Sequence, residues 1–163
     1  MKAKTLLKLE YGILTGAAGG IAGALAMHAA RRIAQKMGLL RTPLPLKVER
    51  RLEEKVRLAH KTNKDQEKAL AFGEHLLVGA MFGAAFGAMR SGFEFPPLPS
   101  GPLFGLGVYA LSVAGIGPAL HLARGPWDQN LETVQRRLLV HLLYGTVLGV
   151  AVNRMDRMTG QSG

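Results

Sequence analysis

The chain of 163 residues contains no cysteine and few aromatic or acidic side chains. Without cysteine it can form neither a disulfide bond nor a thiolate metal site, although this says nothing firm about its cellular compartment. Only one tryptophan is present, and 11 acidic residues stand against 21 basic ones. The nucleophile-elbow, P-loop and dinucleotide-binding signatures of common enzymes are also missing from the sequence. We therefore expect no enzymatic activity and no cofactor.

Charged residues are segregated along the chain. None occurs in residues 11–30, 75–89, 95–123 or 138–153, whereas 12 of the Lys and Arg residues lie in 31–68. An uncharged stretch of about 20 residues is long enough to cross the hydrocarbon core of a membrane. The two shorter stretches can also span it if flanking charged side chains snorkel to the interface. The alternative, a soluble helical domain, is disfavoured because glycine weakens helices in water.

The expected fold is all-α. A single membrane domain covers residues 1–163, with four transmembrane helices arranged as two tandem helix pairs and one amphipathic cytoplasmic helix. The basic N-terminus resembles a signal peptide, but its match to the internal repeat described below favours a retained helix. The expected transmembrane helices are 10–37, 67–90, 103–124 and 131–156, and the amphipathic helix is 46–61.

Prolines indicate where helices should end or bend. The segment 91–102 contains four of them and is expected to form a hairpin that no helix crosses. Pro118 lies inside the third expected helix. Because proline removes a backbone donor and clashes with the preceding turn, we expect a bend near Gly115 and Gly117.

One motif occurs twice. His-Leu-Leu-x-Gly-x-x-x-Gly is found at residues 75–83 and 141–149, an offset of 66 residues. A weaker match joins the first and third expected helices. Their offset is 93 when the Ala-x-His-x-Ala-Arg ends at 26–31 and 119–124 are aligned, and 89 when their Gly-x-Leu-x-Gly starts are aligned. These matches indicate a duplicated helix pair, and two copies of an even number of helices share one orientation in the membrane.

A histidine stands at the same end of each expected helix. Imidazole titrates near pH ~6.5 and binds transition metals, so four at one depth could form a proton-sensitive gate or a metal site. No cysteine or acidic residue falls at a ligand spacing, which favours proton sensing over metal. The simpler interpretation is structural, with imidazoles bonding carbonyls or lipid phosphates. The candidate pH-sensing or ligand-binding residues are His28, His75, His121, His141 and the adjoining Glu74, which can also be a helix-start acid.

Small residues continue from these histidines in steps of four. Residues four apart share one face of a helix, and small residues there let helix backbones approach closely. The expected helix-packing positions are Gly16, Gly20, Gly79, Gly83, Gly87, Gly117, Gly145 and Gly149.

The basic residues predict orientation and partners. Loops 31–68 and 124–137 together hold 15 of the 21 Lys and Arg residues, which places both loops in the cytoplasm and both termini outside. Anionic lipid headgroups are the expected partner of the loop 31–68. Nucleic acid is not expected, because that loop interleaves acidic residues and has no aromatic side chain. A homo-oligomer is compatible with the glycine-rich helix faces.

The two histidine motifs, the segment PLFGLGVYALSVAGIGPALHLA and the basic first loop together resemble the YagU-like family. These are small bacterial inner-membrane proteins without an assigned activity, and the resemblance covers residues 70–155 best. It implies a bacterial inner-membrane location and a link to acid stress, and it supplies no catalytic residues. We expect a structural or regulatory membrane protein that responds to pH through its histidines. The alternative is a small permease or channel for protons or divalent metal between the two repeats.

Overall fold

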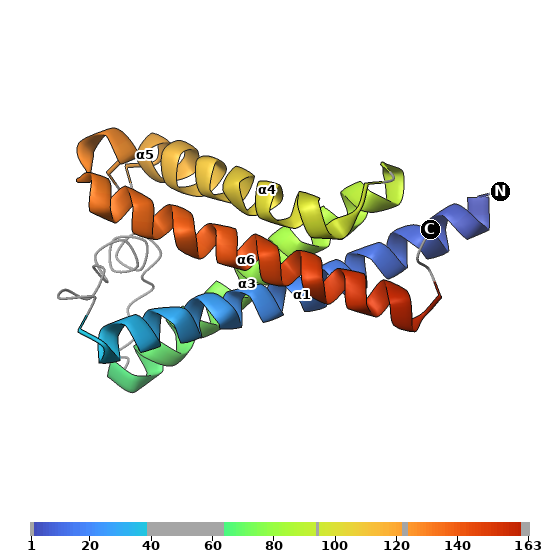
Figure 1. The fold of residues 1–163 in the computed structure, drawn as a ribbon, viewed down its shortest axis with the longest axis horizontal. Helices are drawn as coiled ribbons and strands as arrows, with labels where there is room; N and C mark the ends of the chain where they lie inside the picture. The colour runs from blue at the N-terminus through green and yellow to red at the C-terminus, as the bar shows by residue number, and fades with distance from the viewer. Residues whose placement is uncertain (1, 39–63, 94, 122–123, 161–163) are drawn as a thin grey trace.

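The computed structural model describes residues 2–38, 64–93, 95–121 and 124–160, and every regular element in these ranges is helical. The amphipathic helix expected at 46–61 lies outside the described residues. Figure 1 shows long helices that extend along the length of the molecule and cross one another at an angle. The elements are α1 (Lys2–Lys36), α3 (Lys64–Gly92), α4 (Pro97–Tyr109), the π-helix η1 (Ala110–Ile116), α5 (Gly117–Ala119), the 3-10 helix η2 (Pro126–Asp128) and α6 (Leu131–Met158).

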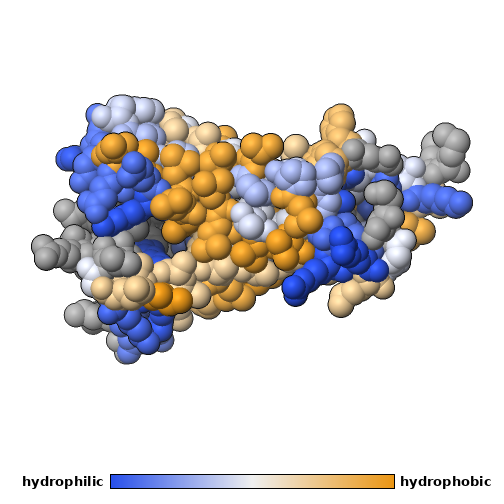
Figure 2. Space-filling view, viewed as in Figure 1, coloured by the Kyte–Doolittle hydropathy of each residue, from blue (hydrophilic) through white to orange (hydrophobic). Residues whose placement is uncertain are grey.

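Four helices are long and apolar enough to cross a membrane, which confirms the all-α, membrane-compatible fold expected from the sequence. The third of them is continuous from Pro97 to Ala119 through α4, η1 and α5. Figure 2 shows an apolar surface around the middle of the molecule, with hydrophilic residues gathered towards both ends. This distribution suits a bilayer, because charged groups stay near water while apolar side chains face lipid.

The helices begin and end at positions that differ from the expected ones. Helix α1 begins at Lys2, so the basic lead-in continues directly into the first span. Helix α4 begins at Pro97, so the proline-rich segment 91–102 is partly helical and not a hairpin throughout. Proline is tolerated in the first turn because the backbone N–H that it lacks has no partner there.

The third span is irregular in the turns before Pro118. The segment Ala110–Ile116 is π-helical, and the backbone N–H of Gly117 donates to the carbonyl of Ser112, five residues earlier. Since Pro118 cannot donate, the wider turn rearranges the hydrogen bonds around the missing N–H. Helix α5 then ends at Ala119, and His121 adopts a positive φ of 56° in the following turn. His121 therefore does not lie in a helix extending to residue 124.

Helices α1 and α3 pack closely against each other at glycine residues. A side chain placed on Gly16 or Gly20 would overlap the carbonyl oxygen of Gly83 or Gly79, respectively. The same is true between α4 and α6, where Gly101 faces the carbonyl of Gly145. Backbones that approach this closely gain dispersion contacts along their length, which is how membrane helices associate without a hydrophobic driving force. We call α1–α3 the first helix pair and α4–α6 the second helix pair.

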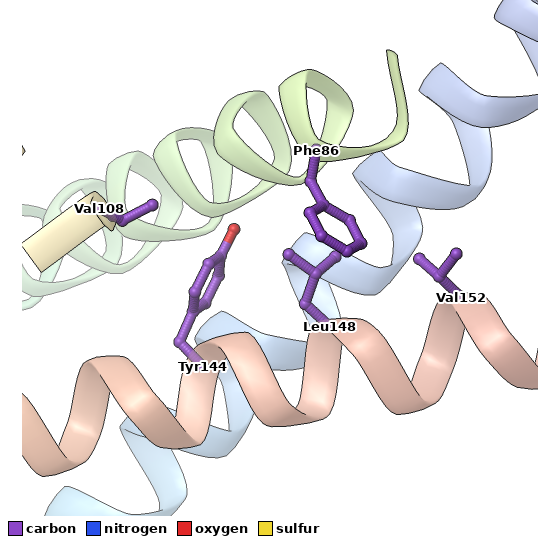
Figure 3. Packing of buried hydrophobic residues seen from close by; sticks show 5 residues of the cluster. All are labelled: Phe86, Val108, Tyr144, Leu148 and Val152. Atoms are coloured by element: carbon purple, nitrogen blue, oxygen red, sulfur yellow. The ribbon is translucent and has the colours of Figure 1, made fainter. Parts of the chain in front are cut away.

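Helix α6 connects the two pairs through a second face. Its row Tyr144, Leu148 and Val152 is buried, and Leu148 and Val152 are 0% exposed. Figure 3 shows Leu148 below Phe86 of α3 and the Tyr144 side chain rising from α6 towards α3. Gly19 and Gly23 of α1 lie against this row. Large side chains of α6 thus fill the space between the pairs, where Gly19 and Gly23 also let α1 approach α6, and glycine-to-glycine contacts bring the backbones together within each pair.

Candidate functional site

A cavity of about 300 Å³ lies between the two helix pairs and is lined by residues of all four spans. Its walls are mostly apolar, and its polar groups include the two histidines that open the repeated motif. It is open to the surface, since His75 and Val78 remain exposed. The lining residues are Ala24, Met27, His75, Val78, Gly79, Phe82, Val108, Ser112, His141 and Tyr144.

His141 is held in a defined orientation beside the cavity. Its Nδ1 lies 2.7 Å from the carbonyl oxygen of Arg137. Because a carbonyl only accepts, Nδ1 carries the hydrogen and donates, and Nε2 is the nitrogen that can take a further proton. The ring also contacts Tyr109 edge to face, with centroids 5.4 Å apart. The half-buried imidazole can therefore change charge at Nε2 without losing its backbone bond.

His75 of α3 and His141 of α6 line the same cavity. The electrostatic neighbours of His75 are His28 and Arg31 of α1 and His141 of α6. For His141 the neighbours are Arg137 on its own helix and Tyr109 of α4. None of these neighbours is acidic, so among these described residues a proton added to either imidazole lies beside neutral or positive groups. Like charges in one apolar enclosure repel more strongly than in water.

The remaining expected site residues lie apart from the cavity lining. His28 is half-buried and contacts Phe72 edge to face at 4.9 Å between ring centroids. His121 is exposed in the turn that follows α5, and Glu74 is exposed on α3. Two of the four expected histidines thus converge on one cavity, a third is an electrostatic neighbour of His75, and the fourth lies elsewhere at the same end of the molecule.

The glycine contacts align the first span with the third in a register that differs from both sequence matches. Gly20 contacts Gly79 and Gly83 in the first pair, and Gly101 contacts the matching Gly145 and Gly149 in the second. Gly20 therefore corresponds to Gly101, at an offset of 81 residues. The packing offset of 81 is smaller than the sequence offset of 89 by about two helical turns. At an offset of 81 the counterpart of His28 is Tyr109, which contacts His141. His121 is therefore not the packing equivalent of His28.

Residues missed by the sequence reasoning hold the opposite end of the molecule. The Arg90 Nη1 atom of α3 lies 3.0 Å from the Asp156 Oδ2 atom of α6, with side chains only 20% and 9% exposed. The Arg90 Nε–H also donates to the Phe95 carbonyl at 3.2 Å. Nearby, the hydroxyls of Tyr11 and Thr159 lie 2.7 Å apart. These contacts join the first pair to the second, and nothing in the local sequence around either charge indicates its partner.

Two tyrosines beside the cavity also went unpredicted. The Tyr144 hydroxyl donates to the Gly79 carbonyl at 2.7 Å, which joins α6 to α3 within the site. Tyr109 is 8% exposed, and its hydroxyl has no hydrogen-bond partner within the described part of the chain. A buried hydroxyl is normally bonded, so the two tyrosines form a contrasting pair, one bonded and one not. An aromatic position in an apolar stretch is not by itself a signal for either role.

The glycines expected to pack helices lie mainly where the backbones meet. Seven of the eight, all but Gly117, are at sites where an added side chain would crowd the neighbouring helix. Gly117 is buried in α5. Gly12, Gly101 and Gly105 take part in the same contacts and were absent from the expected set. The close approach fixes the backbones of each pair and so positions both histidines.

Within the described ranges, no group of three or more His, Cys, Asp or Glu side chains could hold a metal ion. The chain matches no protein-family model, no curated protein and no solved structure.

Proposed function

We propose that the chain is a bacterial inner-membrane protein of structural or regulatory type, in which protonation of His75 and His141 loosens one end of two tandem helix pairs. It acts through its conformation and its partners and has no enzymatic activity of its own. The single observation that carries the proposal is that both histidines of the repeated motif line one cavity between the pairs.

The contacts support movement between the pairs and not within them. Inside each pair, glycines hold backbones in contact. Between the pairs, the end opposite the histidines is joined by the Arg90–Asp156 ion pair. At the histidine end the two pairs border the cavity, and the Tyr144–Gly79 hydrogen bond links them there. Repulsion between two imidazolium groups would therefore act across the cavity, at the end of the molecule that lacks the ion pair.

Duplication supports the same proposal. Under the packing register, His75 corresponds to His141 and Met27 corresponds to Val108, and all four residues line the cavity. We propose that the cavity lies near an axis relating two like-oriented pairs. The bacterial inner-membrane location, the cytoplasmic placement of the loops 31–68 and 124–137, and the contact of 31–68 with anionic lipid are parts of this proposal. They rest on the basic-residue distribution and on the resemblance to the YagU-like family.

Thermal unfolding in nanodiscs between pH 8 and pH 5 tests the proposed function. Free imidazole gains its proton near pH ~6.5, and two imidazolium groups that line one cavity repel each other. We expect the wild type to lose about 1–2 kcal/mol of stability over this range, or roughly 2–8 °C in Tm. The His75→Gln/His141→Gln variant should show a flatter profile, and His121→Gln should follow the wild type. Matching profiles for wild type and the double variant would refute the sensor.

A second candidate function is passage of protons or divalent metal between the pairs. The position of the cavity between all four spans is the observation that favours it. Purified protein in liposomes should then conduct protons, measured with an internal pH dye, above the rate of empty liposomes. A rate equal to that of empty liposomes would eliminate this alternative and leave the conformational proposal intact.

A further inference from the structure

The cavity between the helix pairs has the composition of a site for an amphipathic anion. Apolar side chains form much of its lining, and we call Met27, Val78, Phe82 and Val108 together the apolar wall. The polar groups are two imidazoles and two hydroxyls, and no acidic side chain is among the ten lining residues. Ligand sites commonly combine a largely apolar surface with a few placed polar groups. Here those groups suit a negatively charged head.

The polar groups of the lining are not equally available to a ligand. The Ser112 hydroxyl donates to the Val108 carbonyl at 2.5 Å, and the Tyr144 hydroxyl donates to the Gly79 carbonyl. Both hydroxyl hydrogens are therefore already used. His141 donates Nδ1–H to its own helix and leaves Nε2 free of a backbone bond. The imidazoles are thus the groups that can supply new N–H donors, and they do so when protonated.

Charge around the cavity favours the same kind of ligand. Arg31 is an electrostatic neighbour of His75, and Arg137 is a neighbour of His141. An anionic head between the imidazoles would relieve the repulsion among these positive groups. A cationic head would add to it, and a neutral head would gain only the apolar contacts.

We propose that this cavity binds a carboxylate with a short alkyl chain, its head between His75 and His141 and its chain against the apolar wall. The volume of about 300 Å³ limits the size of the ligand. At about 30 Å³ per water-sized group, it holds roughly ten non-hydrogen atoms. Octanoate is an acid of this size. Since Val78 is 48% exposed on the open side, the chain can enter laterally without unfolding a helix.

The proposal rests on the proposed function in one respect, because it needs His75 and His141 to become protonated in the folded protein. Its pH dependence follows from two titrations. A carboxyl group ionises above about pH 4.3 and imidazole is protonated below about pH 6.5. Binding should therefore be tightest between these values and weaken towards pH 8. Bound carboxylate should also reduce the loss of thermal stability at low pH.

The test uses the full chain in nanodiscs and radiolabelled octanoate at pH 6.0, with retention on empty nanodiscs subtracted. We expect saturable binding of one octanoate per chain, at least tenfold weaker at pH 8.0. His75→Gln/His141→Gln should weaken binding at least tenfold, and His121→Gln, the same change outside the cavity, should leave it unaltered. Val78→Phe should also weaken it, because the larger ring occupies the open side of the cavity while both imidazoles remain.

Octanol serves as the neutral probe of equal chain length. Competition by octanol as strong as that by unlabelled octanoate would overturn the proposal, since the head group would then contribute nothing. Unchanged octanoate binding in the double histidine variant would overturn it as well. The pH profile of thermal stability without ligand separates the proposed octanoate binding from the proposed pH response. A pH-dependent profile with no octanoate binding would reject the ligand and keep the pH response, and a flat profile would reject the pH response itself.

Discussion

The two ends of the molecule are held together in opposite ways. At the end with the chain termini, polar contacts cross from the first helix pair to the second, and the Arg90–Asp156 ion pair is largely buried. At the other end, His75 and His141 line a cavity between the same two pairs. Both ends use similar backbone contacts within each pair. We propose from this comparison that the ion-paired end fixes the arrangement of the pairs and that the histidine end can adjust.

The largest expected effect on stability is at the end with the chain termini, where the Arg90–Asp156 ion pair lies. Asp156→Asn removes the carboxylate that pairs with the partly buried guanidinium of Arg90 and should cost about 3 kcal/mol, because Arg90 keeps its charge without a carboxylate beside it. Thermal unfolding in nanodiscs at pH 7.5 measures the loss. The double variant Arg90→Met/Asp156→Leu should recover most of it, since neither charge is then buried. A loss below about 1 kcal/mol for Asp156→Asn would show that the ion pair does not hold this end.

The next effect concerns the contacts within a pair, which must be rigid for the two ends to behave differently. Gly83→Ala places a methyl group against the carbonyl of Gly16 and should destabilise the protein by about 1–3 kcal/mol. Gly73→Ala is the matched control in the same helix, where a methyl group meets no atom within 4 Å. It should be neutral or stabilise the helix by up to about 1 kcal/mol. Equal Tm values for the two variants would contradict the close approach of α1 and α3.

A smaller effect separates the two tyrosines near the cavity. Tyr144→Phe removes a hydrogen bond between α6 and α3 and leaves the Gly79 carbonyl short of a donor, at a cost of about 1 kcal/mol. Tyr109→Phe removes a buried hydroxyl without a partner among the described residues, so it should be neutral or slightly stabilising. The difference in Tm between these variants is the measured quantity. A loss for Tyr109→Phe as large as that for Tyr144→Phe would mean that the Tyr109 hydroxyl has a ligand or partner.

Much of the fold follows from the sequence because membrane spans depend on local properties. Uncharged stretches locate the four long helices, and glycines at steps of four indicate where backbones meet. Pro118 likewise signals the irregular turns of η1. The start of α4 at Pro97 was missed because a proline that ends one helix can also begin the next.

The site was only partly predictable because it depends on register and on pairing over long distances. Of the four histidines expected to share one level, His75 and His141 of the repeated motif line the cavity. The match that paired His28 with His121 relied on common small residues, whereas backbone contacts pair His28 with Tyr109. Arg90 and Asp156 are 66 residues apart and lie near helix ends, where charges are frequent. No local pattern distinguishes such a buried pair from ordinary interfacial charges.

Distances between spin labels at each end, measured as a function of pH, test the central claim most directly. The absence of cysteine makes the labelling clean, and exposed residues are available at both ends. Leu70→Cys/Leu139→Cys reports on the histidine end and Leu6→Cys/Met158→Cys on the other. Between pH 7.5 and pH 5.5 we predict a longer distance for the first pair of labels, no change for the second, and no change for either in His75→Gln/His141→Gln. A first distance that is independent of pH, or one that changes equally without the histidines, would contradict the account.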